Sequence, residues 1–177
     1  MNRQIRLENK EFSLQPLTET DFEIVYAAAS DPVIWEQHPN KDRWKREVFR
    51  TFFEGAIQSG GAYKIIRKSD NAVIGSTRFY DYNAEESSVL IGYTFYVAEC
   101  WGKGINSQVK ALMFDYAFDF VESIYLHVGA ENIRSQIAVD RLGAIKTEER
   151  EVAYHGELPK QNYIYRLDKG SWTLLRR

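Results

Sequence analysis

Residues 101–110 read WGKGINSQVK, and the interpretation of the whole chain depends on this stretch. Gly102 and Gly104 bracket a single lysine, between an apolar run and a helical pattern. Each glycine costs roughly 0.5–1 kcal/mol of backbone entropy relative to alanine. A tight turn explains the pair, and so does a backbone that must approach a bulky anion. The loop by itself leaves both explanations open.

The segments on either side of the loop favour the anion. VLIGYTFYV at 89–97 is a continuous apolar and aromatic run, typical of a buried strand. After the loop, apolar residues with helical spacing predict a long amphipathic helix: Ile105, Val109, Leu112, Met113, Tyr116, Ala117 and Phe120. A helix N-terminus presents unpaired N–H groups and a positive dipole end, and glycines before it let a phosphate approach. Strand, glycines and helix together therefore predict a phosphate cradle.

The common nucleotide-binding patterns do not match this loop. The GxxxxGK[ST] pattern is absent, and GxGxxG fails because Ser107 stands where the third glycine belongs. The cradle therefore belongs to another class of phosphate-containing ligand.

Hydrophobic periodicity and turn residues predict a mixed α/β fold. Strands are expected at 12–16, 62–68, 73–80, 89–97, 124–128, 145–154 and 163–167. Helices are expected at 19–29, 41–58, 105–120 and 134–142. The order β-α-α-β-β-β-α-β-α-β-β predicts one mixed sheet with helices packed on its faces.

Length and composition exclude several classes of protein. The chain of 177 residues suits one domain spanning 1–177, with a substantial core. Its formal charge of −2 and the lack of a Lys/Arg block argue against nucleic acid as a partner. The first residues, MNRQIRLENKEF, do not form a secretory signal, and no run approaches the roughly 18 apolar residues of a membrane helix. The single cysteine, Cys100, fits a cytoplasmic location, and the three histidines match no metal-ligand spacing.

Two segments resemble the GCN5-related N-acetyltransferases (GNAT), and within them the RimJ/RimL-like branch, which includes ribosomal-protein N-terminal acetyltransferases. The family's pyrophosphate signature, [QR]xxGx[GA], falls on Trp101 to Asn106, where Trp101 and Asn106 replace the first and last signature residues. ENIRSQIAVDRLGAIKTE at 131–148 is similar to the family's NxxSxxxxxKLGF segment. IGYTF at 91–95 also looks like the strand before the loop. The resemblance covers residues 12–167.

The resemblance implies a GNAT fold, a mostly antiparallel mixed sheet with a splayed pair of central strands and about four helices. It also implies acetyl-CoA as cosubstrate and no metal. The pyrophosphate is expected on the loop residues, and the pantetheine arm beside the strand end, with Asn132 and Ser135 as further contacts. The implied cofactor-binding residues are Phe95, Tyr96, Val97, Gly102, Lys103, Gly104, Ile105, Asn106, Ser107, Asn132 and Ser135. Asn132 and Ser135 are equally explained as the polar start of a helix.

The resemblance also implies catalytic groups, and here the sequence departs from the family. By resemblance, Ser135 is a candidate to protonate the departing thiolate or to hold its sulfur. Val139 stands where many relatives have a tyrosine acid. Leu90 stands where Rim-like enzymes often carry a glutamate base. The substitute bases are Tyr93, Glu86, Asp81 and Glu99, each of which is also explained as surface or core. Cys100 is not a candidate nucleophile, because no His or Asp lies nearby in sequence to activate it.

The expected partner is an amine acceptor: a protein N-terminus, a small amine or an antibiotic. Aromatic residues of the early helices and His38 are expected in the core or along the acceptor cleft: Trp35, Trp44, Phe49, Phe52 and Phe53. Glu148, Glu149 and Glu151 are expected as a solvated edge or as an attraction for a cationic acceptor. A homodimer is a further candidate assembly, formed through the last hairpin or through exposed aromatic residues.

Three functions fit these patterns. The first is an N-acetyltransferase in which the amine attacks acetyl-CoA directly in a ternary complex. The second is a non-catalytic acyl-CoA-binding module, which the missing glutamate and tyrosine favour. The third is an α/β interaction domain in which the glycine loop is only a turn.

Overall fold

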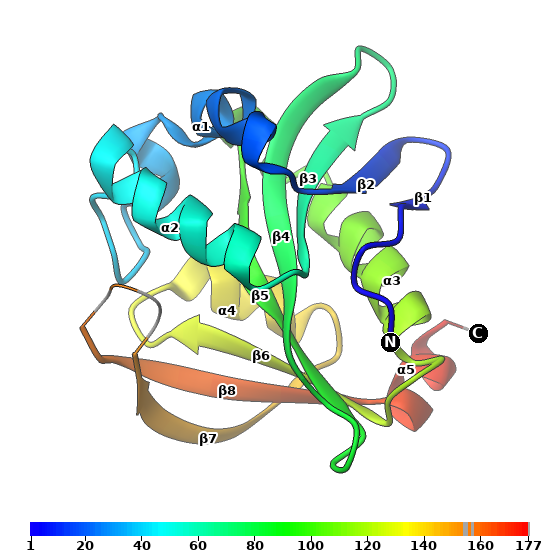
Figure 1. The fold of residues 1–177 in the computed structure, drawn as a ribbon. Coiled ribbons are helices and arrows are strands. Elements are labelled where there is room, and N and C mark those ends of the chain that lie inside the picture. The colour runs from blue at the N-terminus through cyan, green and yellow to red at the C-terminus, as the bar shows by residue number, and fades with distance from the viewer. Residues whose placement is uncertain (154–155, 157, 177) are drawn as a thin grey trace.

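The computed structural model describes residues 1–153, 156 and 158–176. Within them, eight strands form one twisted sheet in the order β1-β2-β3-β4-β5-β6-β8-β7 (Figure 1). The strands are β1 (Leu7–Glu8), β2 (Phe12–Pro16), β3 (Ala62–Arg67), β4 (Ala72–Asn83), β5 (Ser88–Tyr96), β6 (Ser123–Gly129), β7 (Ile145–Val152) and β8 (Lys160–Asp168). The mixed α/β fold predicted from the sequence is confirmed.

The sheet opens in its middle, between β5 and β6. These two strands form the parallel pair of the sheet, and their pairing covers only Ser88–Leu90 against Ser123–Tyr125. Beyond Tyr125, β6 continues to Gly129 paired with β8 alone, while β5 continues paired with β4. The expected splayed pair of central strands is therefore present, and one edge of β5 is left without a strand partner after Leu90.

A β-bulge lies in β5 where the strands part. Between the pairs Arg78↔Gly92 and Ser76↔Phe95, β5 uses one residue more than β4. Tyr93 accommodates the extra residue with a φ of 52°, in the left-handed region that side chains other than glycine rarely adopt. The bulge bends β5 beside the opening and changes which face each side chain takes.

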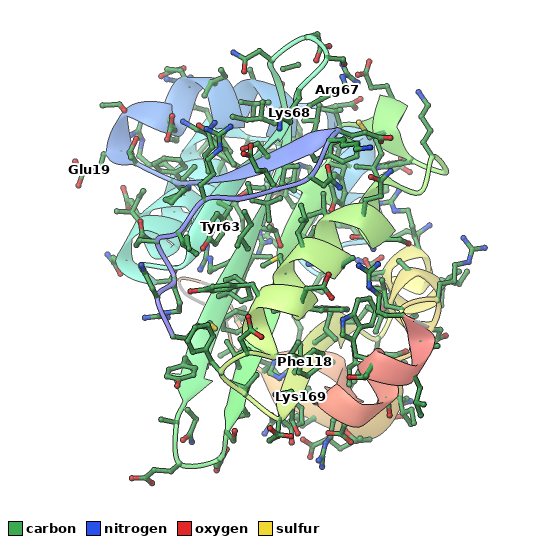
Figure 2. All side chains as sticks on the ribbon, turned by 90° about the vertical axis from the view of Figure 1, so that its right-hand side faces the viewer. Glu19, Tyr63, Arg67, Lys68, Phe118 and Lys169 are labelled. Atoms are coloured by element: carbon green, nitrogen blue, oxygen red, sulfur yellow. The ribbon has the colours of Figure 1, made fainter. Side chains whose placement is uncertain are left out.

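Helices cover both faces of the sheet (Figures 1 and 2). One face packs against α1 (Phe22–Ala29) and α2 (Arg46–Gln58), through a cluster of aromatic residues that includes Phe95 of β5. The other face packs against α3 (Ile105–Ala117), α4 (Ile133–Asp140) and α5 (Lys169–Leu175). In the described part of the chain, no helix is long and apolar enough to cross a membrane.

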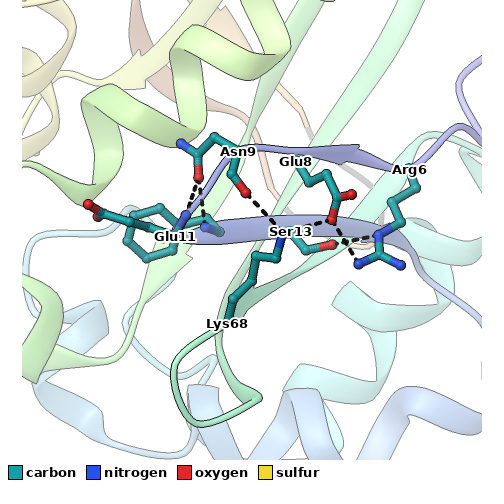
Figure 3. Close-up of polar contacts among 7 residues, drawn as sticks. Arg6, Glu8, Asn9, Glu11, Ser13 and Lys68 are labelled. Carbon is teal, nitrogen blue, oxygen red and sulfur yellow. Dashed lines mark hydrogen bonds and ion pairs between the residues drawn. The ribbon is translucent and has the colours of Figure 1, made fainter.

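Polar contacts tie the turn between β1 and β2 to the rest of the sheet and to α3. Asn9 Oδ1 accepts hydrogen bonds from the backbone N–H groups of Glu11 and Phe12, and Lys68 Nζ donates to the Asn9 carbonyl at 3.0 Å (Figure 3). Asn9 Nδ2 in turn donates to Gln108 Oε1 in the first turn of α3. This turn therefore fixes the N-terminal end of the helix that follows the glycine loop.

The helix predicted at 41–58 was wrong at its start. The backbone N–H of Lys45 closes a turn onto the Asp42 carbonyl, and α2 begins only at Arg46. The irregular segment before it lets the Arg43 side chain reach the interior. Short elements were missed: β1, the 3-10 turns Pro32–Trp35 and Ala98–Cys100, and α5. Part of the predicted strand 145–154 lies outside the described residues.

Truncating Phe49 tests the aromatic packing of α2 on the sheet. The ring is fully buried and lies 6.2 Å from the ring of Phe95. Phe49→Ala is expected to lower the free energy of unfolding by about 3–5 kcal/mol, because the loss of a buried ring leaves a cavity. Ile24→Ala, at a half-exposed position of α1, is the control and should cost less than about 1 kcal/mol. Urea denaturation measures both, and equal costs would contradict this packing.

Candidate functional site

The glycine loop forms an open cradle at the start of α3. Gly102 and Gly104 both have φ of 72°, and a Cβ added at either would meet nothing within 4 Å. The glycines are therefore required by backbone conformation, and the space above them is open to a ligand. Gly104 is the N-cap of α3, and Gln108 makes the first bond back to its carbonyl at 3.3 Å. The N–H groups of Ile105, Asn106 and Ser107 consequently have no acceptor within the helix.

A cleft of about 630 Å³ runs from this cradle along β5 to the point where β5 and β6 part. Its walls come from the cradle, the bulged part of β5, the end of β6 and the first turns of α4. Of the predicted cofactor residues, the structure brings these together along the cleft: Phe95, Tyr96, Gly102, Gly104, Ile105, Asn106, Ser107, Asn132 and Ser135. The lining does not include Lys103 or Val97, and the Val97 N–H donates to the Ile74 carbonyl.

Trp101 and Asn106, the two residues that depart from the pyrophosphate signature, both make structural contacts. The Trp101 indole donates from Nε1 to the Tyr96 carbonyl at 3.3 Å, and the Arg134 guanidinium stacks 3.8 Å above the Trp101 ring. Asn106 Oδ1 accepts from the Tyr96 hydroxyl at 3.3 Å. Asn106 is therefore held toward the strand, and Arg134 stands over the cradle as a positive charge that the sequence analysis did not single out.

Asn132 and Ser135 take the polar positions at the start of α4. Asn132 is the N-cap, and its Oδ1 accepts from the Ser135 N–H at 3.1 Å. The helix-start explanation of Asn132 thus describes the geometry, while both side chains also line the cleft. Val139, one turn further along, is buried in the cleft wall, so the position expected for a tyrosine acid is apolar.

The base candidates are scattered. Tyr93 lines the cleft, with the Arg78 guanidinium 3.9 Å above its ring. Glu86 and Asp81 line a separate hollow at the β4–β5 hairpin, which shares His127 with the cleft. Glu99 is exposed and pairs with Arg67 at 2.9 Å. Of these four residues, the structure places only Tyr93 in the cleft.

The acceptor side of the cleft is aromatic. Trp35 and His38 line it, whereas Phe49, Phe52 and Phe53 lie in the core behind it. The rings of Trp35 and His38 meet edge to face at 5.4 Å, and the Arg43 guanidinium lies over Phe52 at 4.6 Å. Burial and the nearby Arg43 hold the pKa of His38 well below its usual value, so its imidazole is neutral at physiological pH. Glu148, Glu149 and Glu151 lie on the exposed strand β7.

Besides Arg134, the sequence analysis missed a buried lysine in the cleft. Lys110 of α3 is 3% exposed, lines the cleft and donates to Thr94 Oγ1 at 2.7 Å. Burial lowers its pKa to about 7. The sequence does place Lys110 beside the apolar face of the helix, since it follows Val109 and precedes Met113. A lysine flanking an apolar face is usually solvated, however, and the partners on β4 and β5 are far away in sequence.

The sequence matches the model of a known protein family. Residues 11–145 match the model of the acetyltransferase (GNAT) domain, so the chain belongs to the GNAT acetyltransferase family. A comparison with curated proteins finds no match.

Solved structures agree with this assignment at the level of the fold. A GCN5-related N-acetyltransferase from Brucella melitensis has a TM-score of 0.81 and 17% identity, covering 98% of this chain and 82% of that one. A spermidine N-acetyltransferase from Vibrio cholerae, in complex with CoA and spermine, has a TM-score of 0.71 and 15% identity, covering 93% and 99%. RimJ of Mycobacterium smegmatis, in complex with CoA-disulfide, has a TM-score of 0.70 and 15% identity, covering 90% and 82%.

The protonation of His127 provides a pH test of the cleft. Burial lowers the pKa of His127 to about 4. The unfolded chain takes up this proton near pH 6.5, so His127 lowers the stability of the fold as pH falls from about 6.5 to 4. An NMR titration of the imidazole nitrogens should show His127 neutral at pH 5. A midpoint near 6.5 would contradict its burial between the cleft and the hairpin hollow.

Proposed function

We propose that the chain is an acetyl-CoA-dependent N-acetyltransferase, acting as one domain over residues 1–177 in the cytoplasm. An acceptor's primary amine attacks the acetyl group directly while both substrates are bound. The observation that carries this proposal is the unpaired edge of β5 next to an open helix N-terminus. An extended amide-containing arm fits the first feature, and a pyrophosphate fits the second.

The cleft residues suit acetyl-CoA as a substrate. The N–H groups of Ile105, Asn106 and Ser107 would receive the pyrophosphate, and the glycines leave room for it. Arg134 above the Trp101 ring and Arg141 at the cleft wall add positive charge on that side. The pantetheine arm would then run along Phe95 and Tyr96 toward the bulge. CoA in the Vibrio and Mycobacterium structures supports this choice of ligand.

A primary amine is the acceptor class that the family and the neighbours support. The spermidine N-acetyltransferase is bound to an amine, spermine. The acceptor would enter between Trp35, His38 and Tyr93, on the aromatic side of the cleft. The amine must lose its proton before attack, since an ammonium has no lone pair. Tyr93 is the candidate base that lines this side of the cleft, and the choice between a protein N-terminus and a small amine stays open.

A second function is favoured by a specific observation. Leu90 and Val139 place apolar groups where many relatives have a base and an acid. A non-catalytic acyl-CoA-binding module would keep the cradle and lose the chemistry.

Titration calorimetry with acetyl-CoA tests the cradle. The wild-type protein is expected to bind at micromolar level. Gly104→Asp should weaken binding at least 100-fold, roughly 2.7 kcal/mol, because its carboxylate repels the pyrophosphate. Gly104→Asn is the matched control, since asparagine has the same shape and also adopts the left-handed backbone but carries no charge. Equal binding by the Asp and Asn variants would contradict a phosphate at this loop.

Amine-dependent release of CoA separates the two functions. A thiol reagent should detect free CoA only when acetyl-CoA and an amine are both supplied, at a rate that rises with amine concentration. The panel contains spermine, small monoamines and peptides with free N-termini. Tight acetyl-CoA binding without release by any of these amines would instead support the binding module.

A further inference from the structure

Lys110 is a buried amine without an anionic partner among the described residues. Its Nζ donates to Thr94 Oγ1 at 2.7 Å and to Thr77 Oγ1 at 3.1 Å. None of the ion pairs formed by the described residues includes it. Burying an ammonium among hydroxyl groups alone is costly, and an apolar side chain of similar length would avoid that cost. A lysine at this place therefore calls for a reason other than stability.

The amine lies at the end of the predicted path of the substrate arm. Lys110 stands one turn after Asn106, on the same side of α3, so the cradle and the amine share one helix face. Thr94 lies in the bulge of β5, next to Tyr93. An arm that begins at the cradle and runs along β5 past Phe95 reaches its thioester end at this bulge.

The side of the sheet on which Lys110 lies indicates that its amine serves the leaving thiolate and not the acceptor. Val109 and Met113, which flank Lys110 on α3, belong to the same core cluster as Val139 of α4. The aromatic acceptor side, with Trp35 and Phe95, belongs to the cluster on the opposite face. Lys110 is therefore on the side of the apolar Val139 position and away from the incoming amine.

We propose that Lys110 is the catalytic acid that protonates the thiolate of CoA as it leaves. The proposal rests on the proposed acetyltransferase function and goes beyond it by naming the proton donor. It supplies, from α3, the acid that Val139 cannot supply from α4.

The proton and electron balance is simple. The neutral acceptor nitrogen forms a bond to the acetyl carbon, and the carbon–sulfur bond breaks with its electron pair on sulfur. Lys110 Nζ gives a proton to the sulfur, so the thiol leaves and Nζ becomes a neutral amine. The acetylated nitrogen loses one proton to solvent, and Nζ regains one from solvent before the next turnover.

The hydroxyl pair suits both protonation states of the amine. Thr77 Oγ1 and Thr94 Oγ1 lie 2.8 Å apart, and Thr94 Oγ1 also reaches the Gly92 carbonyl at 3.3 Å. An ammonium donates to both hydroxyls and keeps a third N–H for the cleft. A neutral amine can accept from one of the hydroxyls, because a threonine hydroxyl both donates and accepts.

The pKa of the Lys110 amine suits the transfer of a proton to a thiolate. Burial lowers the pKa of Lys110 to about 7, close to the roughly 8.5 of an ordinary thiol, so the proton passes with little loss of driving force. Burial is the cause of this shift. Besides Arg78 of β4, the titratable or cationic groups in the elements around Lys110 are those that line the cleft with it: His38, Arg43, Tyr80, Tyr93, Tyr96, Cys100, His127, Arg134 and Arg141. Tyr96 donates to Asn106, Arg78 packs on the opposite face, and His127 is neutral above about pH 4.

The first experiment measures the amine without any substrate. NMR of protein labelled with ¹³C at lysine Cε should show one lysine resonance, absent from Lys110→Met, that titrates near pH 7. Lys110→Met should also stabilise the fold at pH 7, with a gain that shrinks as pH rises toward 10. The sign follows because the unfolded chain holds the Lys110 proton up to about pH 10.5, whereas the folded chain releases it near 7. A Lys110 resonance that titrates near 10.5 overturns the proposal.

The second experiment separates a catalytic role from a structural one. Lys110→Met should bind acetyl-CoA within a few-fold of wild type and lose about 100-fold in kcat. The wild-type kcat should fall as pH rises above about 7, where the acid is lost, and this fall should be absent in Lys110→Met. Lys110→Arg keeps the charge but cannot release a proton, so it should not restore kcat. Lys10→Met, at an exposed position, is the control for the loss of a lysine.

The outcomes distinguish this proposal from the proposed function. If wild-type protein binds no acetyl-CoA or releases no CoA with amines, both fall. If wild type is active and Lys110→Met keeps its kcat and pH profile, or Lys110→Arg restores both, the acid role of Lys110 falls alone.

Discussion

The site depends on one interrupted pairing in the sheet. β5 and β6 are held together by only a short parallel ladder, and after Leu90 the edge of β5 has no strand beside it. Backbone groups that lose a strand partner need another, and an extended ligand with amide groups is a suitable one. The bulge at Tyr93 lies where the strands part, and the cradle of α3 lies at the far end of the same strand. Cleft, bulge and cradle thus form one continuous path.

The two faces of the sheet present different side chains to the cleft. The cluster around α1 and α2 is rich in aromatic rings and borders the cleft through Trp35. The cluster around α3 and α4 mixes aliphatic and aromatic residues, and on α3 the buried Lys110 amine lies beside it with two threonine hydroxyls. An amine entering from the first side and a thiol departing toward the second would be served by different groups, as two substrates that react in one cleft require.

Much of this arrangement was predictable from the sequence. The run at 89–97, the glycines and the periodic helix indicated the cradle, because each signal is local. The predicted positions of Asn132 and Ser135 were also local, since both start a helix. The end of the β5–β6 ladder was expected from the resemblance alone, because no local pattern shows where two strands part. Lys110 was missed because its partners, Thr77 and Thr94, lie on two other strands. The start of α2 was wrong because tertiary placement of Arg43 overrides helical propensity.

The central claim, that the free edge of β5 and the N-terminus of α3 hold one CoA molecule, is tested most directly by residue-resolved amide hydrogen exchange with and without CoA. The account predicts slower exchange at the α3 N–H groups of Ile105, Asn106 and Ser107 and, in the same titration, along β5 at Phe95 and Tyr96. Binding that leaves both sets of amides unprotected would contradict it.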